Sequence, residues 1–337
     1  MSMTVVRTLP YDKWRHFVDA QPAGNIFHTP EMYQVFERAN GHRPELWATL
    51  NDGGEVVALF TPVRISVKEG PMRYLTTRAV TYGSVLAKPT PEGQEGLGRL
   101  LAAYRAESRR RATLFTELRH VSDVSVFRPV LEKNRFHHEE HLNYLIDLEQ
   151  PLASIWEQIA KPARKAVERA QRRGTTAEEV QDRTCVAQVH QLLQSTFSHA
   201  QVWLADRSLF EAAFDVLAPK GMVRMMLARG DGVYAATTVE LQYKGVIFIW
   251  YIGWDREYRA LYPNDAVVWQ SLQWGVQHGY RCFDWGGAGV PNKPYGPREF
   301  KSKYGGQLVN YGRATSVHRP VALALSRAGY ELYRKTL

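Results

Sequence analysis

Two lysines follow a glycine-rich turn near the carboxyl end of the sequence. Gly286, Gly287 and Gly289 come after a segment that alternates as a short strand, and Lys301 and Lys303 lie further along. Glycine frees the backbone for a tight turn or for the close approach of a ligand. In an extended segment the two lysines would share a face, because side chains alternate along a strand. Such a turn facing a lysine could bind an anion or stabilise an oxyanion. The alternative is a glycine loop with solvated lysines.

The elements that would position this stretch recur twice along the chain. A hairpin, a further strand, a helix and a strand are predicted up to Leu118 and again up to Trp285. Each hairpin turn is rich in Asn, Asp or Gly, the residues that favour tight turns. The recurrence predicts a mixed α/β chain built from two similar units.

Composition limits the class of protein and the kind of partner. A chain of 337 residues with 45% hydrophobic residues suits two globular domains. The net charge of +9 favours polyanionic partners such as RNA, nucleotide-linked substrates or an anionic membrane surface. The start resembles no signal peptide and no apolar run would span a bilayer, so we expect a cytoplasmic protein. Residues 321–337 predict an amphipathic helix that either caps a core or rests on a membrane as a peripheral contact.

A metal site is not expected. The only cysteines are Cys185 and Cys282, which argues against a thiolate site or a disulfide framework. Residues His137–His141 match the H-x-x-E-H pattern of zinc peptidases, but that chemistry requires a helix. The following residues read as a strand, so we predict an exposed polar strand or loop that binds no zinc.

A basic segment lies between the two units. Residues 163–173 combine a narrow apolar stripe with a cationic face, and Gly174 is a suitable helix stop. The face is either a binding surface for a polyanion or a solvated helix face. Its cations are Arg164, Lys165, Arg169, Arg172 and Arg173.

Two stretches together resemble the Fem family. Phe-Asp-Trp-Gly-Gly at 283–287 and Phe-Lys-x-Lys-Tyr-Gly-Gly at 300–306 resemble its carboxy-terminal signature, and the strand and basic helix over 142–174 resemble the opening of its second domain. Fem enzymes move an amino acid from aminoacyl-tRNA onto an amine of a peptidoglycan precursor. The resemblance implies two tandem GNAT-like domains, 1–147 and 148–337, with a cleft between them. The C-terminal helix could pack back on the first domain.

The resemblance also implies roles for particular residues. Lys301 matches the family's Phe-Lys lysine and would stabilise the oxyanion, with Lys303 as the second candidate. The cations of 163–173 would bind tRNA. The family's tyrosine one turn after its diphosphate-binding arginine is missing here, which leaves the acceptor open: a peptidoglycan precursor or another amine, nucleotide- or lipid-linked. The candidate substrate-binding residues are Tyr251, Arg207, Arg38, Gly286 and Gly287.

The acyl donor is expected to be aminoacyl-tRNA, with no further cofactor. GNAT enzymes that use acyl-CoA grip its pyrophosphate with backbone N–H groups of a glycine-containing loop at a helix start. Residues 255–265 contain no glycine, and Pro263 lacks an N–H. Two alternatives stay open. One is an acyl-CoA-dependent N-acyltransferase, and the other is a non-catalytic RNA-binding module on a degenerate acyltransferase fold.

Overall fold

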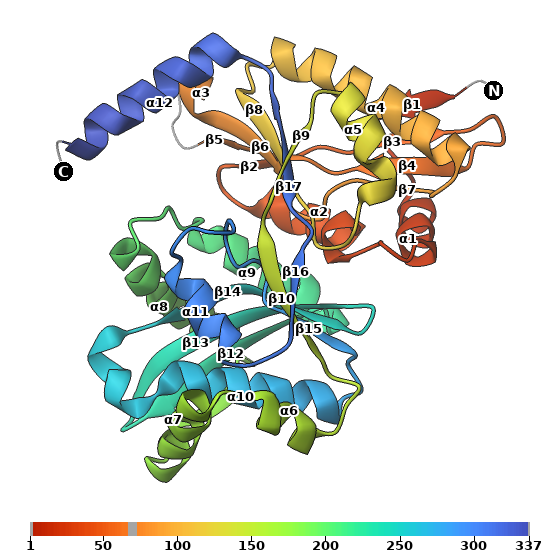
Figure 1. Ribbon diagram of the computed structural model, residues 1–337. Coiled ribbons are helices and arrows are strands. Elements are labelled where there is room, and N and C mark those ends of the chain that lie inside the picture. The colour runs from red at the N-terminus through yellow and green to blue at the C-terminus, as the bar shows by residue number, and fades with distance from the viewer. Residues whose placement is uncertain (1–2, 67–72, 336–337) are drawn as a thin grey trace. The chain divides into compact units, whose positions relative to one another are not determined.

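The computed structural model describes residues 3–66 and 73–335, and its contacts divide the chain into two compact units (Figure 1). The first unit comprises Met1–Glu140 and Tyr311–Leu337, and the second comprises His141–Asn310. In the described residues, no helix combines the length and apolar character that crossing a membrane requires.

The first unit contains two sheets, in the orders β1-β3-β4-β7 and β2-β5-β6-β8-β17-β9. Strands β6 and β8 run parallel and are joined through the long helix α4, which packs on β3 and β4. Thr90 caps α4 by accepting a hydrogen bond from the N–H of Gly93 (3.2 Å), and Pro91 occupies the first turn. The elements are β1 (Thr4–Val6), α1 (Tyr11–Ala20), α2 (Pro30–Arg38), β2 (His42–Pro44), β3 (Trp47–Leu50), β4 (Val56–Phe60), β5 (Val63–Ser66), α3 (Arg73–Thr76), β6 (Thr77–Thr81), β7 (Leu86–Ala87), α4 (Pro91–Arg110), β8 (Phe115–Arg119), α5 (Arg128–Lys133), β9 (His137–Glu139), β17 (Arg313–Val317) and α12 (Pro320–Lys335).

The second unit is built on one seven-stranded sheet, in the order β11-β12-β13-β14-β15-β10-β16. Strands β14 and β15 are parallel and are joined through α10, while the other pairs are antiparallel. Helices α7 and α10 cover one face of the sheet, and α8 and α9 cover the other (Figure 1). The elements are β10 (Leu142–Asp147), α6 (Leu152–Gln158), α7 (Lys161–Arg172), β11 (Thr176–Glu179), α8 (Val186–His199), α9 (Arg207–Leu217), β12 (Val223–Gly230), β13 (Val233–Tyr243), β14 (Val246–Trp254), the 3₁₀ helix η6 (Arg256–Leu261), α10 (Pro263–Gln277), β15 (Cys282–Asp284), α11 (Gly296–Ser302) and β16 (Gln307–Asn310).

The predicted recurrence of elements is confirmed. In each unit a hairpin is followed by a strand that connects through a long helix to a parallel neighbour: β6-α4-β8 in the first unit and β14-α10-β15 in the second. The mixed α/β class predicted from the sequence is therefore present in both units.

The domain ranges 1–147 and 148–337 are corrected by the structure. Strand β10 lies between β15 and β16, so it belongs to the second sheet. After Asn310 the chain returns to the first unit, where β17 is inserted between β8 and β9. Helix α12 follows it there and contacts α3, with Ser326 Oγ donating to the carbonyl of Leu75 (2.6 Å). These pairings join residues far apart in the sequence. The expected cleft between the domains stays a prediction.

Candidate active site

The glycine turn that follows β15 lies against β10. The N–H of Trp285 donates to the carbonyl of Tyr144 (3.1 Å), and the N–H of Ala288 donates to the carbonyl of Leu142 (2.6 Å). These bonds extend the antiparallel pairing of β10 and β15 beyond the end of the strand, so the turn has a fixed position on the sheet.

Two side chains satisfy the N–H groups between these bonds. The N–H of Gly286 donates to Asp284 Oδ1 (2.8 Å), and the N–H of Gly287 donates to Asn143 Oδ1 (2.9 Å). The Asn143 amide also donates to Asp284 Oδ1 (2.6 Å). All N–H groups from residue 285 to residue 288 therefore have partners within the protein, so the backbone of Gly286 and Gly287 does not form an open oxyanion hole here.

Gly286 occupies a position that only glycine fits. Its φ is 75°, and a Cβ there would lie 2.6 Å from the carbonyl oxygen of Ile249 on β14. The turn thus approaches the backbone of β14 directly, beyond the residues through which β14 and β15 are paired.

Helix α11 places two cations against the carbonyl groups of the same turn. Lys301 is 9% exposed, and Arg298 lies one helical turn before it. Lys301 Nζ donates to the carbonyls of Trp285 (2.7 Å) and Gly287, and the Arg298 guanidinium donates to those of Ala288 (2.7 Å) and Val290. The turn is held between β10 on its N–H side and α11 on its carbonyl side.

The predicted extended segment at Lys301 and Lys303 is wrong. Residues 296–302 are helical, and positions two apart on a helix point about 200° apart around its axis. Lys301 therefore points into the glycine turn, while Lys303 is exposed at the end of the helix.

Burial controls the charges at the turn. It raises the pKa of Asp284 to about 6, against the lowering effects of hydrogen bonds from Asn143 and Gly286 and of the charge on Lys301. Burial also lowers the pKa of Lys301 to about 8, while the charge on Asp284 raises it. Both groups thus titrate near neutral pH, as ionisable groups at functional sites often do.

Strand β14 carries a bulge beside the glycine turn. Tyr251 pairs with Val239 and Ile249 pairs with Glu240, so Trp250 is the extra residue. A bulge changes the face to which the following side chains point, and bulges are common next to active sites.

Tyr251 points towards α8 and α9 as a consequence. Its ring lies 5.8 Å from that of Phe197 on α8 and 4.9 Å from that of Phe210 on α9. Trp250 also contacts Tyr251 (5.1 Å). Because Phe197, Trp250 and Tyr251 are only partly buried, they form an accessible aromatic cluster on this face of the sheet.

The two predicted arginines lie in different units. Arg207 is the first residue of α9, 56% exposed, and pairs with Glu211 (2.9 Å). Phe210 follows it one turn later and contacts Tyr251, so the structure brings Arg207 and Tyr251 into the same region. Arg38 is exposed in the last turn of α2 in the first unit, and nothing within either unit brings it to the other candidates.

Helix α7 presents the predicted basic face. Ala163, Val167 and Ala170 are buried and the helix packs on α10, which confirms the apolar stripe. Arg169 donates to the hydroxyl of Tyr262 (3.0 Å), the residue that precedes α10. Arg164 is partly buried, and the exposed cations are Lys165, Arg169, Arg172 and Arg173.

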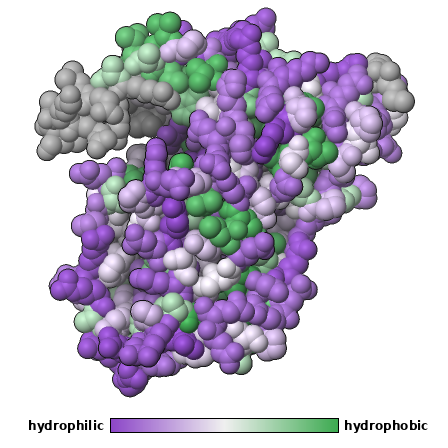
Figure 2. Space-filling model, in the orientation of Figure 1, coloured by the Kyte–Doolittle hydropathy of each residue, from purple (hydrophilic) through white to green (hydrophobic). Residues whose placement is uncertain are grey.

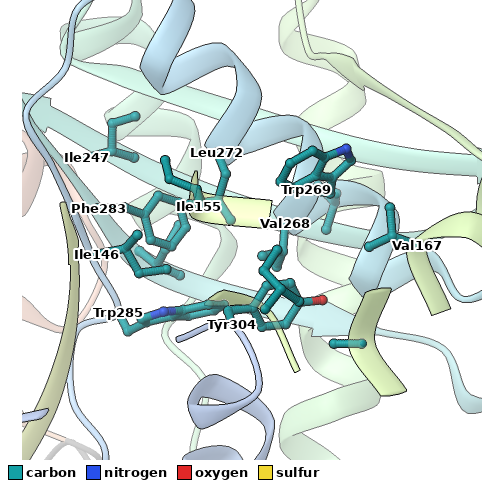
Figure 3. Close-up of a cluster of buried hydrophobic side chains, with 14 of the residues drawn as sticks. Ile146, Ile155, Val167, Ile247, Val268, Trp269, Leu272, Phe283, Trp285 and Tyr304 are labelled. Atoms are coloured by element: carbon teal, nitrogen blue, oxygen red, sulfur yellow. The ribbon is translucent and has the colours of Figure 1, made fainter. Parts of the chain in front are cut away.

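The start of α10 lies at the same edge of the sheet as the glycine turn. Asp265, in the first turn of α10, accepts a hydrogen bond from the hydroxyl of Tyr304 (2.7 Å). The ring of Tyr304 packs on Trp285 (5.5 Å), and both belong to the buried cluster beneath α10 (Figure 3). Tyr304 thereby connects the glycine turn to the helix that follows β14.

The H-x-x-E-H segment is extended, as predicted. His137–Glu139 forms β9, and the exposed side chains of His137 and Glu139 do not converge with the ring of His138, which stacks on His120 (6.2 Å). In the part of the chain that the structure describes, no cluster of His, Cys, Asp or Glu is suited to a metal. That the chain binds no zinc stays a prediction.

Comparison with known proteins identifies the architecture. Residues 158–302 match the family described as "Acetyltransferase (GNAT) domain". A comparison with curated protein sequences finds no match. The structure is similar to the crystal structure of FemX, with a TM-score of 0.73 and 15% identity over 97% of this chain and 100% of that one. The chain has a Fem-like duplicated GNAT fold.

Two further structures share this fold across nearly their whole length. A tandem GNAT protein from the clavulanic acid biosynthesis pathway has a TM-score of 0.61 and 12% identity, over 95% of this chain and 99% of that one. L-PGS from Bacillus licheniformis has a TM-score of 0.58 and 14% identity, over 95% of this chain and 97% of that one. The matched acetyltransferase domain supports a transferase of the GNAT acyltransferase type.

In the second GNAT unit, sequence reasoning missed three residues of the site. Asp284 stands inside the Phe-Asp-Trp-Gly-Gly signature, but its burial was not evident. Arg298 precedes Lys301 by one helical turn, a spacing that becomes informative only once residues 296–302 are known to be helical. Asn143 lies on β10, and no local pattern connects it with a turn that follows it by more than a hundred residues in the sequence.

Proposed function

We propose that the chain transfers an aminoacyl group from aminoacyl-tRNA to an acceptor amine and forms an amide bond. The observation that carries the proposal is the contact between Arg169 and Tyr262, by which the basic helix α7 borders the start of α10. Tyr304 joins the start of α10 to the glycine turn, so a polyanion on α7 would lie next to that turn.

Two features of the helix starts favour tRNA over CoA as the donor. Pro263 removes an N–H from the first turn of α10, and Asp265 places a carboxyl group there. The equivalent helix of the first unit, α4, begins with Pro91 and carries Glu92 in its first turn. A pyrophosphate group at the start of α4 or of α10 would lie beside an acidic side chain. A helix start with free N–H groups and no acidic side chain attracts anions instead.

The chemistry requires little beyond orientation and charge stabilisation. The acceptor amine attacks the ester carbonyl of the aminoacyl-tRNA, so a C–N bond forms and the C–O bond to the tRNA ribose breaks. The amine loses its proton, and the leaving ribose hydroxyl gains one. Lys301 uses two N–H bonds on the turn, so one remains to stabilise the oxyanion of the tetrahedral intermediate. This scheme needs no cofactor, and the base can be the substrate itself.

The acceptor would bind near the aromatic cluster of Tyr251. Arg207, whose carboxylate partner Glu211 is solvent-exposed in part, could exchange that partner for a phosphate group of a nucleotide- or lipid-linked acceptor. Arg38, exposed in the first unit, is a weaker candidate for the same role.

The test is transfer from charged tRNA. Total tRNA charged with labelled amino acids is incubated with the protein and a panel of amine acceptors, and products are detected by mass spectrometry. We expect a labelled amide product that disappears when the tRNA is deacylated first. The acyl-CoA alternative predicts turnover of a CoA thioester instead. Binding of tRNA without any product would indicate a non-catalytic RNA-binding module.

A further inference from the structure

A group of arginines in the first unit lacks carboxylate partners. On α4, Arg99 pairs with Glu95 (2.7 Å) and Arg110 with Glu107 (4.0 Å). Arg105 and Arg109 on the same helix, and Arg135 just after α5, make no ion pair with any described residue. These three cations are therefore available to an external anionic partner.

Two of these arginines, Arg105 and Arg109, lie near a buried histidine. His318 is 5% exposed, and its ring packs edge-on against Tyr104, which precedes Arg105 (6.0 Å). Burial lowers the pKa of His318 to about 4, with further lowering by the charges of Arg105 and Arg109. The pKa of Arg105 is lowered by burial and by the charges of Arg109 and Arg135. Arg109 and Arg135 therefore each repel Arg105, a cost that a bound anion would reduce.

Two buried nitrogen atoms in this cluster have no hydrogen-bond partner. They are His318 Nδ1 and Arg105 Nε. The other ring nitrogen of His318 is hydrogen-bonded to Thr116 Oγ1 (2.7 Å). An unsatisfied buried polar atom is costly, so the hydrogen bonding inside this cluster is incomplete.

Exposed aliphatic side chains flank His318 in the sequence. Val317 precedes His318 and is 37% exposed, while Val321 and Leu325 on the first turns of α12 are 75% and 62% exposed. The opposite side of α12 faces α3, where Leu323 is buried. Figure 2 shows the apolar surface of these first turns in green at the upper left.

We propose that Arg105, Arg109 and Arg135, together with Val321 and Leu325, dock the protein on an anionic phospholipid membrane. Lipid phosphates would neutralise the arginines, and the aliphatic side chains would leave water for the acyl boundary. RNA would satisfy the cations but offers no apolar phase for Val321 and Leu325, so the combination favours a membrane. The proposal is independent of the acyl donor.

The experiment is vesicle co-sedimentation of the full chain. We expect binding to vesicles that contain phosphatidylglycerol and much weaker binding to pure phosphatidylcholine. Arg109→Gln with Arg135→Gln should weaken partitioning about 25-fold at low salt, roughly fivefold for each charge. Val321→Ser with Leu325→Ser should weaken it by at least as much without changing the net charge, and this loss should persist at high salt.

Matched variants control for general charge and general exposure. Arg43→Gln with Arg99→Gln removes two exposed cations elsewhere in the first unit, and Leu308→Ser removes an exposed aliphatic side chain in the second. Both should bind vesicles nearly like the unmodified protein. The proposal is overturned if the control charge variant loses as much binding as the test variant, or if phosphatidylcholine binds equally well. It is also overturned if the Arg109 and Arg135 changes weaken only tRNA retention on a filter.

Discussion

At the residue scale, Lys301 combines a structural contact with an available charge. Its ammonium group bridges the carbonyls of Trp285 and Gly287, which fixes the turn, and its third N–H is not used there. Lys303 has neither the burial nor these contacts. Substitutions at the two positions therefore separate a chemical role from a surface role.

We expect Lys301→Met to lower the single-turnover transfer rate about 100-fold or more, with acceptor affinity little changed, as when an oxyanion donor is lost. It should also lower the free energy of unfolding by about 1–3 kcal/mol, because two buried carbonyls lose their donor. Lys303→Met should leave both quantities nearly unchanged. If Lys303→Met is the damaging change, the role moves to Lys303. If neither slows transfer, this mechanism is wrong.

The pKa of Lys301 predicts a pH dependence. Burial lowers this pKa to about 8, so the ammonium form is present below that pH and is lost above it. We expect the ratio of the rates of the unmodified enzyme and Lys301→Met to fall as pH rises through about 8. The ratio cancels the titration of the acceptor amine, which both enzymes share. A ratio that stays constant up to pH 10 would show that the charge of Lys301 does not contribute.

Asn143 has a positioning role that stability measurements can test. Asn143→Ala would leave the N–H of Gly287 without its acceptor and would remove one donor from Asp284. We expect a loss of about 2–3 kcal/mol in the free energy of unfolding, measured with denaturant. Gln307→Ala, an exposed change on the neighbouring strand β16, serves as the control. Equal effects of the two changes would contradict this account of the turn.

At the element scale, α7 has two distinct faces. Its buried side consists of small residues that let it pack closely on α10, and its opposite side carries the cations. Only one weak ion pair, between Arg172 and Glu168 at 4.0 Å, neutralises charge within the described part of this helix. Such a face suits the phosphate backbone of RNA.

We expect glutamine at Arg164, Lys165, Arg169 and Arg172 together to weaken tRNA binding and to flatten its salt dependence. Each lost phosphate contact lowers the slope of log K against log salt by about 0.7–0.9. Filter binding over a range of salt concentrations measures this change. A control with four other cations neutralised, Arg43, Arg99, Lys133 and Lys220, should keep the original slope. If the unmodified protein, the α7 variant and the control variant all give the same slope of log K against log salt, the cationic side of α7 is only a solvated face.

The bulge in β14 is a second feature at this scale. One extra residue, Trp250, redirects Tyr251 from the α10 face of the sheet to the aromatic cluster on α8 and α9. Pairing with β13 creates this change, and pairing is a property of two strands rather than of one segment.

At the scale of the whole molecule, the second unit is continuous in the sequence while the first is not. Residues 141–310 contain their complete sheet and a buried cluster of their own. We expect this fragment to unfold cooperatively by circular dichroism. A fragment of residues 148–337 lacks β10, a strand in the interior of the sheet, and should show no cooperative transition. The reverse result would restore the original domain boundary.

The sequence by itself determined the local features of this protein. The recurring order of hairpin, strand, helix and strand and the two faces of α7 both depend on neighbours within a few residues. The resemblance of residues 283–306 and 142–174 to the Fem family predicted a duplicated GNAT-like fold. Turn chemistry, helix caps and apolar periodicity are short-range, so a single sequence displays them.

Only the tertiary structure decided how distant segments meet. The assignment of β10 to the second sheet and of residues 311–337 to the first unit depends on strand pairing across most of the chain. The helical state of residues 296–302, and with it the separation of Lys301 from Lys303, depends on the turn that the helix holds. The Asn143–Asp284 contact joins residues 141 positions apart. Such long-range contacts have no periodicity along the sequence, and their cost in chain entropy is recovered only when the whole sheet forms.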